Sequence, residues 1–183
     1  AALILLAACN PAPVEEEAAS AEPLHLRLPM GYIPDPQYAP FYVAVDRGYF
    51  ADEGIELEFD YSFETDGMAL VGANEVPFAL VGGDQAILAR AQDVPVVYIM
   101  EWFQKYPIAI VSREAAGIET PQDLIGRNVG LPGFFGTSYV GYVGLLSAND
   151  ITQDQVQATD IGFTQIETLL SDQAEAVVVF ANN

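Results

Sequence analysis

Cys9 is the only cysteine of the 183-residue chain, and it ends the run Leu6-Ala7-Ala8-Cys9 behind an apolar stretch that begins at Ala1. A cysteine thiol can take a thioether-linked lipid, and the small side chains of Ala7 and Ala8 let a peptidase reach the bond before it. This pattern is typical of the end of a bacterial lipoprotein signal. The alternative is a buried or chance cysteine, which the polar residues that follow disfavour because they offer no core. We therefore expect lipidation of Cys9.

The segments on either side of Cys9 predict an anchored protein. Residues 1–9 are apolar but shorter than the about twenty residues that cross a bilayer, and they lack the initiator Met and basic start of a whole signal. Residues 10–23 are rich in Pro, Glu, Ala and Ser, a composition that cannot bury enough apolar surface to fold. We expect a signal remnant and a disordered acidic tether, with a multiply acylated Cys9 on the extracytoplasmic face of the bacterial cytoplasmic membrane.

Residues that could carry out catalysis are scarce in this sequence. His25 is the single histidine and falls within an expected strand, which favours a surface or sheet position. The sequence has no Gly-x-Ser-x-Gly elbow and no group of His and Cys with the spacing of a zinc or iron site. Residues 130–136 are rich in glycine, but they lack the Lys followed by Ser or Thr of a phosphate loop. We therefore expect no enzyme, no catalytic residue, no metal and no cofactor.

Aromatic, amide and hydroxyl side chains instead follow the expected strands, where the crevice of an open α/β sheet usually binds its ligand. Trp102 and Phe134 offer flat faces that could sandwich an aromatic ring, and the polar groups offer hydrogen bonds to its edge. The N–H groups after Gly136 open an expected helix and could bind an anion or a carbonyl oxygen. The predicted ligand-binding residues are Tyr32, Asp35, Gln37, Tyr38, Asp84, Gln85, Trp102, Phe134, Phe135, Thr137, Ser138, Tyr139, Asn182 and Asn183.

The expected positions of these residues follow from β-like runs that alternate with helix-like runs. This is the pattern of a parallel sheet with helices on its faces. In the first half, strands are expected at 24–28, 55–61, 78–81 and 94–100, and helices at 38–47, 68–72 and 84–91, the last with Asp84 as its N-cap. In the second half, strands are expected at 108–111, 129–131 and 176–180, with another ending at Ile161. Helical segments are expected after Thr120 and Thr152, from Thr137 or Ser138 to Ala148, and at 164–170.

Charge and length limit the partners and the domain count. The net charge of −20 comes from 26 acidic and 6 basic residues, and the basic residues are scattered rather than gathered in a stripe, which disfavours nucleic acid. We expect a first α/β lobe over 24–107 and a second over 108–183. Because the sequence stops directly after an expected strand, we expect the second lobe to be incomplete and the chain to be C-terminally truncated.

Several motifs resemble those of solute-binding proteins of ABC importers. They are Gly31-Tyr32-Ile33-Pro34, then Phe41-Tyr42-Val43-Ala44 followed by Gly48-Tyr49-Phe50 and Glu53-Gly54-Ile55, and later Thr120-Pro121-Gln122-Asp123-Leu124. The chain is most similar to the branch related to thiamine-pyrimidine synthases, which includes binders of formylaminopyrimidine, riboflavin and alkanesulfonates. The resemblance implies a type II periplasmic-binding-protein-like fold, in which two hinged α/β lobes close on a small molecule and deliver it to a permease.

The resemblance leaves three kinds of activity open. Abundant aromatic residues favour a planar heterocycle, either riboflavin or a thiamine pyrimidine precursor. An alkanesulfonate or taurine is the alternative. A sulfonate would use the helix start after Gly136 and preferably an Arg, but neither Arg113 nor Arg127 is expected in a crevice loop. The synthases of this family use a histidine after the first strand and a cysteine-rich iron site, whereas this chain has Pro34-Asp35-Pro36-Gln37-Tyr38 and no cysteine beyond Cys9.

Overall fold

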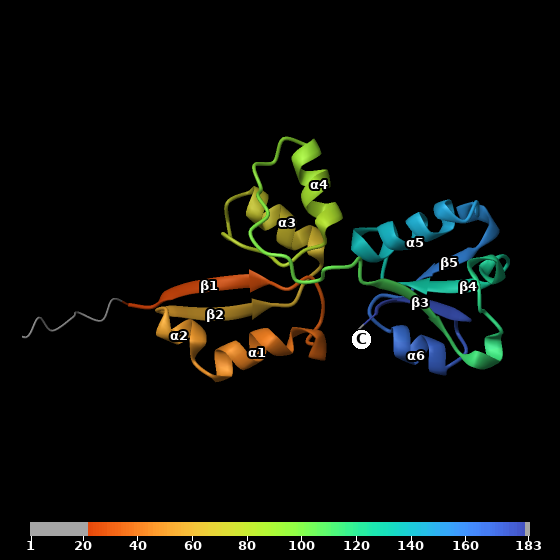
Figure 1. Ribbon diagram of the computed structural model, residues 1–183, viewed down its shortest axis with the longest axis horizontal. Coiled ribbons are helices and arrows are strands. Elements are labelled where there is room, and N and C mark those ends of the chain that lie inside the picture. Colours follow the sequence, from red (N-terminus) through yellow and green to blue (C-terminus); the bar gives the residue numbers. More distant parts are fainter. Residues whose placement is uncertain (1–21, 182–183) are drawn as a thin grey trace, which may run out of the picture.

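The computed structural model describes residues 22–181, which form two α/β lobes joined end to end (Figure 1). We call the elements from β1 to α4, with the segment that follows to residue 107, the first lobe, and the elements from β3 to β6 the second lobe. Cys9, Asn182 and Asn183 lie outside the described residues. None of the helices within residues 22–181 has the length and apolar character needed to cross a membrane.

The first lobe is built on two parallel strands, β1 (Leu24–Pro29) and β2 (Ile55–Asp60). Helices cover both faces of this pair: η1 and the two helices α1 and α2 lie on one side, and α3 and α4 lie on the other (Figure 1). Their bounds are η1 Pro36–Tyr38, α1 Ala39–Asp46, α2 Tyr49–Asp52, α3 Glu64–Gly72 and α4 Gly83–Ala91. Between α1 and α2, Gly48 has a φ of +77°, a conformation that suits glycine and separates the two helices.

The second lobe contains a four-stranded sheet in the order β3-β6-β4-β5. β4 pairs in parallel with β5 and β6, and β3 runs antiparallel to β6. Helices α5 and α6 pack on opposite faces of the sheet (Figure 1). The bounds are β3 Ile108–Ser112, η2 Glu114–Ala116, η3 Pro121–Leu124, β4 Asn128–Leu131, α5 Gly136–Ala148, η4 Gln153–Gln155, β5 Gln157–Asp160, α6 Gln165–Leu170 and β6 Ala176–Phe180.

The second lobe has the larger core. Its fully or nearly fully buried side chains come from β4, β6, α5 and the turns between them: Leu124, Val129, Leu131, Tyr142, Leu146, Ile151, Val156, Ala176 and Val178. The first lobe has a smaller core around Met30, Tyr32 and Tyr38, where β1 ends. The helical turn expected after Thr120 is confirmed, and it begins with a capping box in which the Asp123 carboxylate accepts from the Thr120 N–H at 2.7 Å.

Two expected strands of the first lobe are wrong, because residues 78–81 and 94–100 are irregular. A strand persists only beside a hydrogen-bonded neighbour. The Leu80 N–H donates to the Pro29 carbonyl at 2.8 Å, but no ladder follows at 78–81 or 94–100. The side chains of Val97 and Ile99 are 80% and 73% exposed. Apolar content alone therefore predicted strands for which the described residues supply no partner.

The expected N-caps of α4 and α5 are also wrong. α4 begins at Gly83 with Gly82 as its N-cap, and α5 begins at Gly136 with Phe135 as its N-cap. Asp84 and Thr137 lie in the first turns instead. Their side chains are hydrogen-bonded to each other, from Thr137 Oγ1 to Asp84 Oδ1 at 2.8 Å, and this bond joins the two lobes rather than capping either helix.

Candidate ligand-binding site

The candidate site lies where the loop after β1 meets the first turns of α3, α4 and α5. A cavity of about 610 Å³ runs along the first lobe, a size within the roughly 300–1,000 Å³ of small-molecule sites. A second cavity of only about 30 Å³ lies between the lobes. Glu64 and Thr137 line both cavities, so they mark the boundary between the space in the first lobe and the space between the lobes.

Glu64 is the first residue of α3, and its carboxylate holds the two lobes together. One oxygen, Oε1, accepts from the Gly82 N–H at 3.2 Å, and the other, Oε2, accepts from the Thr137 N–H at 3.1 Å. Burial raises the pKa of the Glu64 carboxyl, and the nearby charge of Asp84 raises it further, while the hydrogen bonds from Thr137 and Gly82 act in the opposite direction. The hydrogen bonds from the Gly82 and Thr137 N–H groups therefore replace the water that the buried carboxylate would otherwise bind.

Glycines make room for this contact. Gly31 has a φ of +76°, and a Cβ there would lie 2.7 Å from Glu64 Cγ. A Cβ at Gly82 would lie 1.8 Å from Thr137 Oγ1. Both distances are shorter than any van der Waals contact, so a side chain at either position would push Glu64 or the second lobe away.

Asp84 forms the second polar junction between the lobes. Besides the bond from Thr137 Oγ1, its carboxylate accepts from Gln85 Nε2 at 2.5 Å and from the Tyr106 hydroxyl at 3.4 Å. The Tyr106 hydroxyl also lies 2.9 Å from the Thr137 carbonyl oxygen. The first turn of α5 is thus bonded to the first lobe through its backbone and through its side chain.

Aromatic rings surround these polar groups. Trp102 packs against Phe41 with ring centroids 4.7 Å apart and an interplanar angle of 32°, and it lines the larger cavity. The buried Tyr38 lines the same cavity and donates its hydroxyl to the Met30 carbonyl at 2.7 Å; burial raises its pKa, so it remains a neutral donor. On the side of the smaller cavity, Tyr32 packs edge-on against Phe163 with centroids 4.7 Å apart. The site therefore offers ring faces with a few hydrogen-bonding groups at their edge.

Residues 35–183 match the model of the NMT1/THI5-like family, which is most of the chain. The chain belongs to the NMT1/THI5-like family. The resemblance found in the sequence is therefore confirmed.

The similar proteins include two named as binding proteins. The riboflavin-binding protein RibY of Chloroflexus aurantiacus is 35% identical over 99% of this chain and 55% of its own length. The formylaminopyrimidine-binding protein of Halalkalibacterium halodurans is 28% identical over 97% of this chain and 53% of its own. A more distant relative is the 4-amino-5-hydroxymethyl-2-methylpyrimidine phosphate synthase of Legionella pneumophila, 24% identical over 85% of this chain and 49% of its own. The chain thus spans about half the length of the curated relatives it matches.

A solved structure confirms the fold class. The periplasmic aliphatic sulphonate binding protein SsuA of Escherichia coli superimposes with a TM-score of 0.57, at 16% identity, over 86% of this chain and 54% of that one. At this identity the likeness concerns the fold alone. This NMT1/THI5-like chain therefore has the mixed α/β architecture of periplasmic solute-binding proteins, as expected.

The structure brings together most of the residues predicted to bind ligand. Those that line the larger cavity are Gln37, Tyr38, Asp84, Trp102 and Thr137. Those that line the smaller cavity are Tyr32, Phe135, Thr137 and Ser138. Those that line neither are Asp35, Gln85, Phe134 and Tyr139.

Each residue outside the cavities has another contact in this NMT1/THI5-like chain. Asp35 caps η1, because its Oδ1 accepts from the Gln37 N–H at 2.9 Å. The Tyr139 hydroxyl donates to Gln153 Oε1 at 2.8 Å. Phe134 is 48% exposed and packs edge-on against Tyr139. Phe134 therefore does not share either cavity with Trp102, which the expected sandwich of a ligand between those two rings would require.

Sequence reasoning missed Glu64, Tyr106 and Phe180, all of which line the larger cavity. Glu64 was missed because α3 was expected to begin at Met68, four residues too late. Glu64 and Asp66 are acidic residues of the kind that the first turn of a helix favours, and this signal could have found the true start. Tyr106 lies in an irregular segment, where no periodicity points to a role.

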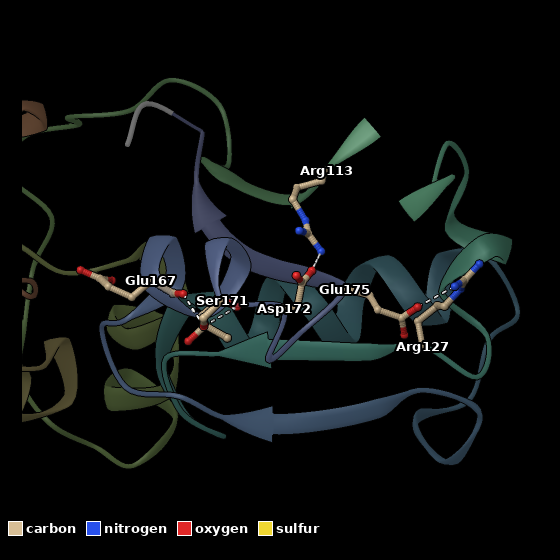
Figure 2. Close-up of polar contacts among 7 residues, drawn as sticks. Arg113, Arg127, Glu167, Ser171, Asp172 and Glu175 are labelled. Carbon is tan, nitrogen blue, oxygen red and sulfur yellow. Dashed lines mark hydrogen bonds and ion pairs between the residues drawn. The ribbon is translucent and has the colours of Figure 1, made fainter. Parts of the chain in front are cut away.

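Charge in the cavity is mainly negative. Its charged lining residues are Glu64, Asp84, Glu101 and the exposed Lys105. Arg113 and Arg127 line neither cavity, in agreement with the expectation that no Arg reaches the crevice. In the second lobe they pair with Asp172 and Glu175, the latter at 2.5 Å (Figure 2). Within residues 22–181 there is no group of three His, Cys, Asp or Glu placed to hold a metal ion.

Proposed function

We propose that this chain belongs to the extracytoplasmic solute-binding receptor of an ABC importer. The receptor captures a small aromatic heterocycle, riboflavin or a thiamine pyrimidine precursor, between its two lobes and delivers it to the permease. The observation that carries this proposal is the cavity of about 610 Å³, lined by Trp102 and Tyr38 beside the amide of Gln37. The two relatives named as binders of riboflavin and formylaminopyrimidine support the same class of ligand.

The location follows from the same proposal. The proteins of this fold that superimpose on the chain include a periplasmic one. We infer that the receptor works outside the cytoplasmic membrane and that a lipid on Cys9 holds it there, so the importer's permease receives the solute from a receptor held nearby.

The proposal is tested by titrating the full-length protein with riboflavin, with 4-amino-5-hydroxymethyl-2-methylpyrimidine and with taurine. Trp102 is the only tryptophan of these 183 residues and it lines the cavity, so the part of the fluorescence change that is lost in Trp102→Phe reports on the cavity. Quenching by a heterocycle with no response to taurine is expected. Tight binding of taurine without any response to the heterocycles would overturn the proposal in favour of a sulfonate receptor.

Two substitutions sharpen this test. Trp102→Ala should weaken binding of the heterocycle about 5- to 150-fold, because stacking on an aromatic side chain is worth about 1–3 kcal/mol per ring. Phe134→Ala is the matched control, since Phe134 lines neither cavity, and should leave affinity unchanged. Because Trp102→Ala removes the fluorescent reporter, both variants are measured by calorimetry or by flavin emission. Equal losses in the two variants would contradict the position of the site.

An enzymatic role is the other alternative, because a synthase is among the relatives. We propose a binding protein without turnover. Prolonged incubation of the full-length protein with Fe²⁺ and candidate substrates, followed by mass spectrometry, should return the heterocycle unchanged. Formation of a pyrimidine product would contradict the proposal.

A further inference from the structure

The N-terminus of α5 has the geometry that attracts anions. α5 is a 13-residue helix, so its first N–H groups point out of the helix and carry the positive end of its dipole. In this chain one of these donors is already engaged by a negative group of the protein itself, since the Thr137 N–H is bonded to the Glu64 carboxylate at 3.1 Å. The carboxylate reaches α5 from the other lobe, 73 residues earlier in the sequence.

The position of Glu64 is built into both lobes. Glycines stand on three sides of the side chain: a Cβ at Gly31 would lie 2.7 Å from Glu64 Cγ, and a Cβ at Gly136 would lie 3.6 Å from Glu64 Oε2. The third glycine, Gly82, donates its N–H to Glu64 Oε1. Both Gly31 and Gly136 have positive φ angles, so each is also suited to glycine by its backbone. The space at Gly31 and the N–H of Gly82 therefore both fit the Glu64 side chain, whereas a Cβ at Gly136 would only be in ordinary van der Waals contact with it.

A second carboxylate strengthens the negative charge at the same place. Asp84 accepts from Thr137 Oγ1 at 2.8 Å, so two acidic side chains of the first lobe meet one residue in the first turn of α5. Lys105 is the only basic side chain among the described residues that line the larger cavity, and it is exposed. An anionic solute at α5 would therefore approach two carboxylates with little compensating positive charge.

We propose that Glu64 is the specificity-determining residue that excludes anionic solutes, such as sulfonates and phosphorylated heterocycles, and restricts the receptor to uncharged or cationic ligands. This inference rests on the proposed function, because it concerns selectivity at the same site. Glu64 supplies internally the negative charge that a sulfonate would otherwise bring to α5.

The test compares ligands that differ in charge. Riboflavin and flavin mononucleotide share the same ring and differ by one phosphate, and methanesulfonate is a small anion without a ring. Their dissociation constants are measured by calorimetry on the full-length protein, on Glu64→Gln, which keeps the shape and removes the charge, and on Glu64→Ala, which also opens the space. Glu58→Gln and Glu58→Ala are the matched controls, because Glu58 is an exposed glutamate of β2 in the same lobe.

The wild type should bind riboflavin at least tenfold more tightly than flavin mononucleotide and should not bind methanesulfonate. The Glu64 variants should reduce this preference at least tenfold, and Glu64→Ala should gain methanesulfonate binding, while the Glu58 variants behave as the wild type. A gain of binding cannot result from unfolding. An unchanged preference in both Glu64 variants, or equally tight binding of both flavins by the wild type, would overturn the inference.

The outcome separates this inference from the proposed function. A wild type that binds neither the flavins nor the pyrimidine contradicts the proposed ligand class. The methanesulfonate titrations then decide the role of Glu64 by themselves: binding gained in Glu64→Ala but not in Glu58→Ala supports it, and no gain refutes it.

Discussion

The bond from Thr137 to Asp84 can be removed without changing the shape of either residue's surroundings. Thr137→Val replaces the hydroxyl by a methyl group and keeps the backbone N–H that donates to Glu64. Thr137 is only 2% exposed, so water cannot replace the lost donor. Hydrogen bonds to charged groups contribute about 1.5–3 kcal/mol, and the low end applies because Asp84 keeps its bond from Gln85. We expect the free energy of unfolding to fall by about 1.5 kcal/mol.

Urea denaturation measures this loss. With an m-value of about 1–3 kcal/mol per M, the midpoint should fall by about 0.5–1.5 M urea. Thr159→Val is the matched control, because the Thr159 hydroxyl also bonds a side chain, Asn128 Oδ1 at 2.7 Å, but on the exposed surface of the second lobe. Its effect should stay within about 0.5 kcal/mol. Equal effects of the two substitutions would refute the view that the Thr137 contact stabilises the junction of the lobes.

Three further predictions concern pH, exposed surface and the anchor. The pKa of Glu64 is raised in the folded chain, and the titratable groups that face it are Asp84, Tyr38 and Tyr106. The wild type should therefore lose stability relative to Glu64→Gln as pH rises through that pKa. Urea midpoints of the two proteins that stay parallel across the acidic range would contradict this. The 183-residue chain should bind the dye ANS, because the apolar side chains at residues 97–100 are exposed. The double substitution Val97→Ser and Ile99→Ser should reduce the dye fluorescence and leave the urea midpoint unchanged. Undiminished fluorescence would show that the dye binds elsewhere. Palmitate labelling of the full-length protein in a bacterium should be lost in Cys9→Ala, and labelling that persists would exclude Cys9 as the lipid site.

The elements that the sequence predicted well are those whose signals are local. In β2, Ile55, Leu57 and Phe59 are more buried than Glu56 and Glu58, as their alternation indicates. The capping box at Thr120 needs only neighbouring residues, so it too could be found. The two-lobed class followed from the order of such elements together with the family resemblance.

The features that the sequence did not predict depend on partners far away in the chain. Residues 94–100 have strand-like composition, but strand formation depends on a neighbour that the pattern does not specify. Asp84 and Thr137 have the residue types of N-caps, yet each is engaged across the lobes by the other, 53 residues away. Glu64 meets α5 over a still longer separation, so no local pattern could reveal that contact.

These contacts also determine which side chains can give affinity to a ligand. The hydroxyl of Thr137 and the carboxylate of Asp84 already satisfy each other, so a ligand that binds either group must first break their bond, and the net gain is small. Trp102 packs against Phe41 and Phe103 and still lines the cavity, so a ring can stack there without breaking a polar contact. Trp102→Ala should therefore weaken binding of the heterocycle far more than Thr137→Val, whereas Thr137→Val should have the larger effect on the contact between the lobes. Calorimetric titration of both variants beside the wild type provides the comparison, and a greater loss of affinity in Thr137→Val would show that the polar junction, rather than the aromatic wall, holds the ligand.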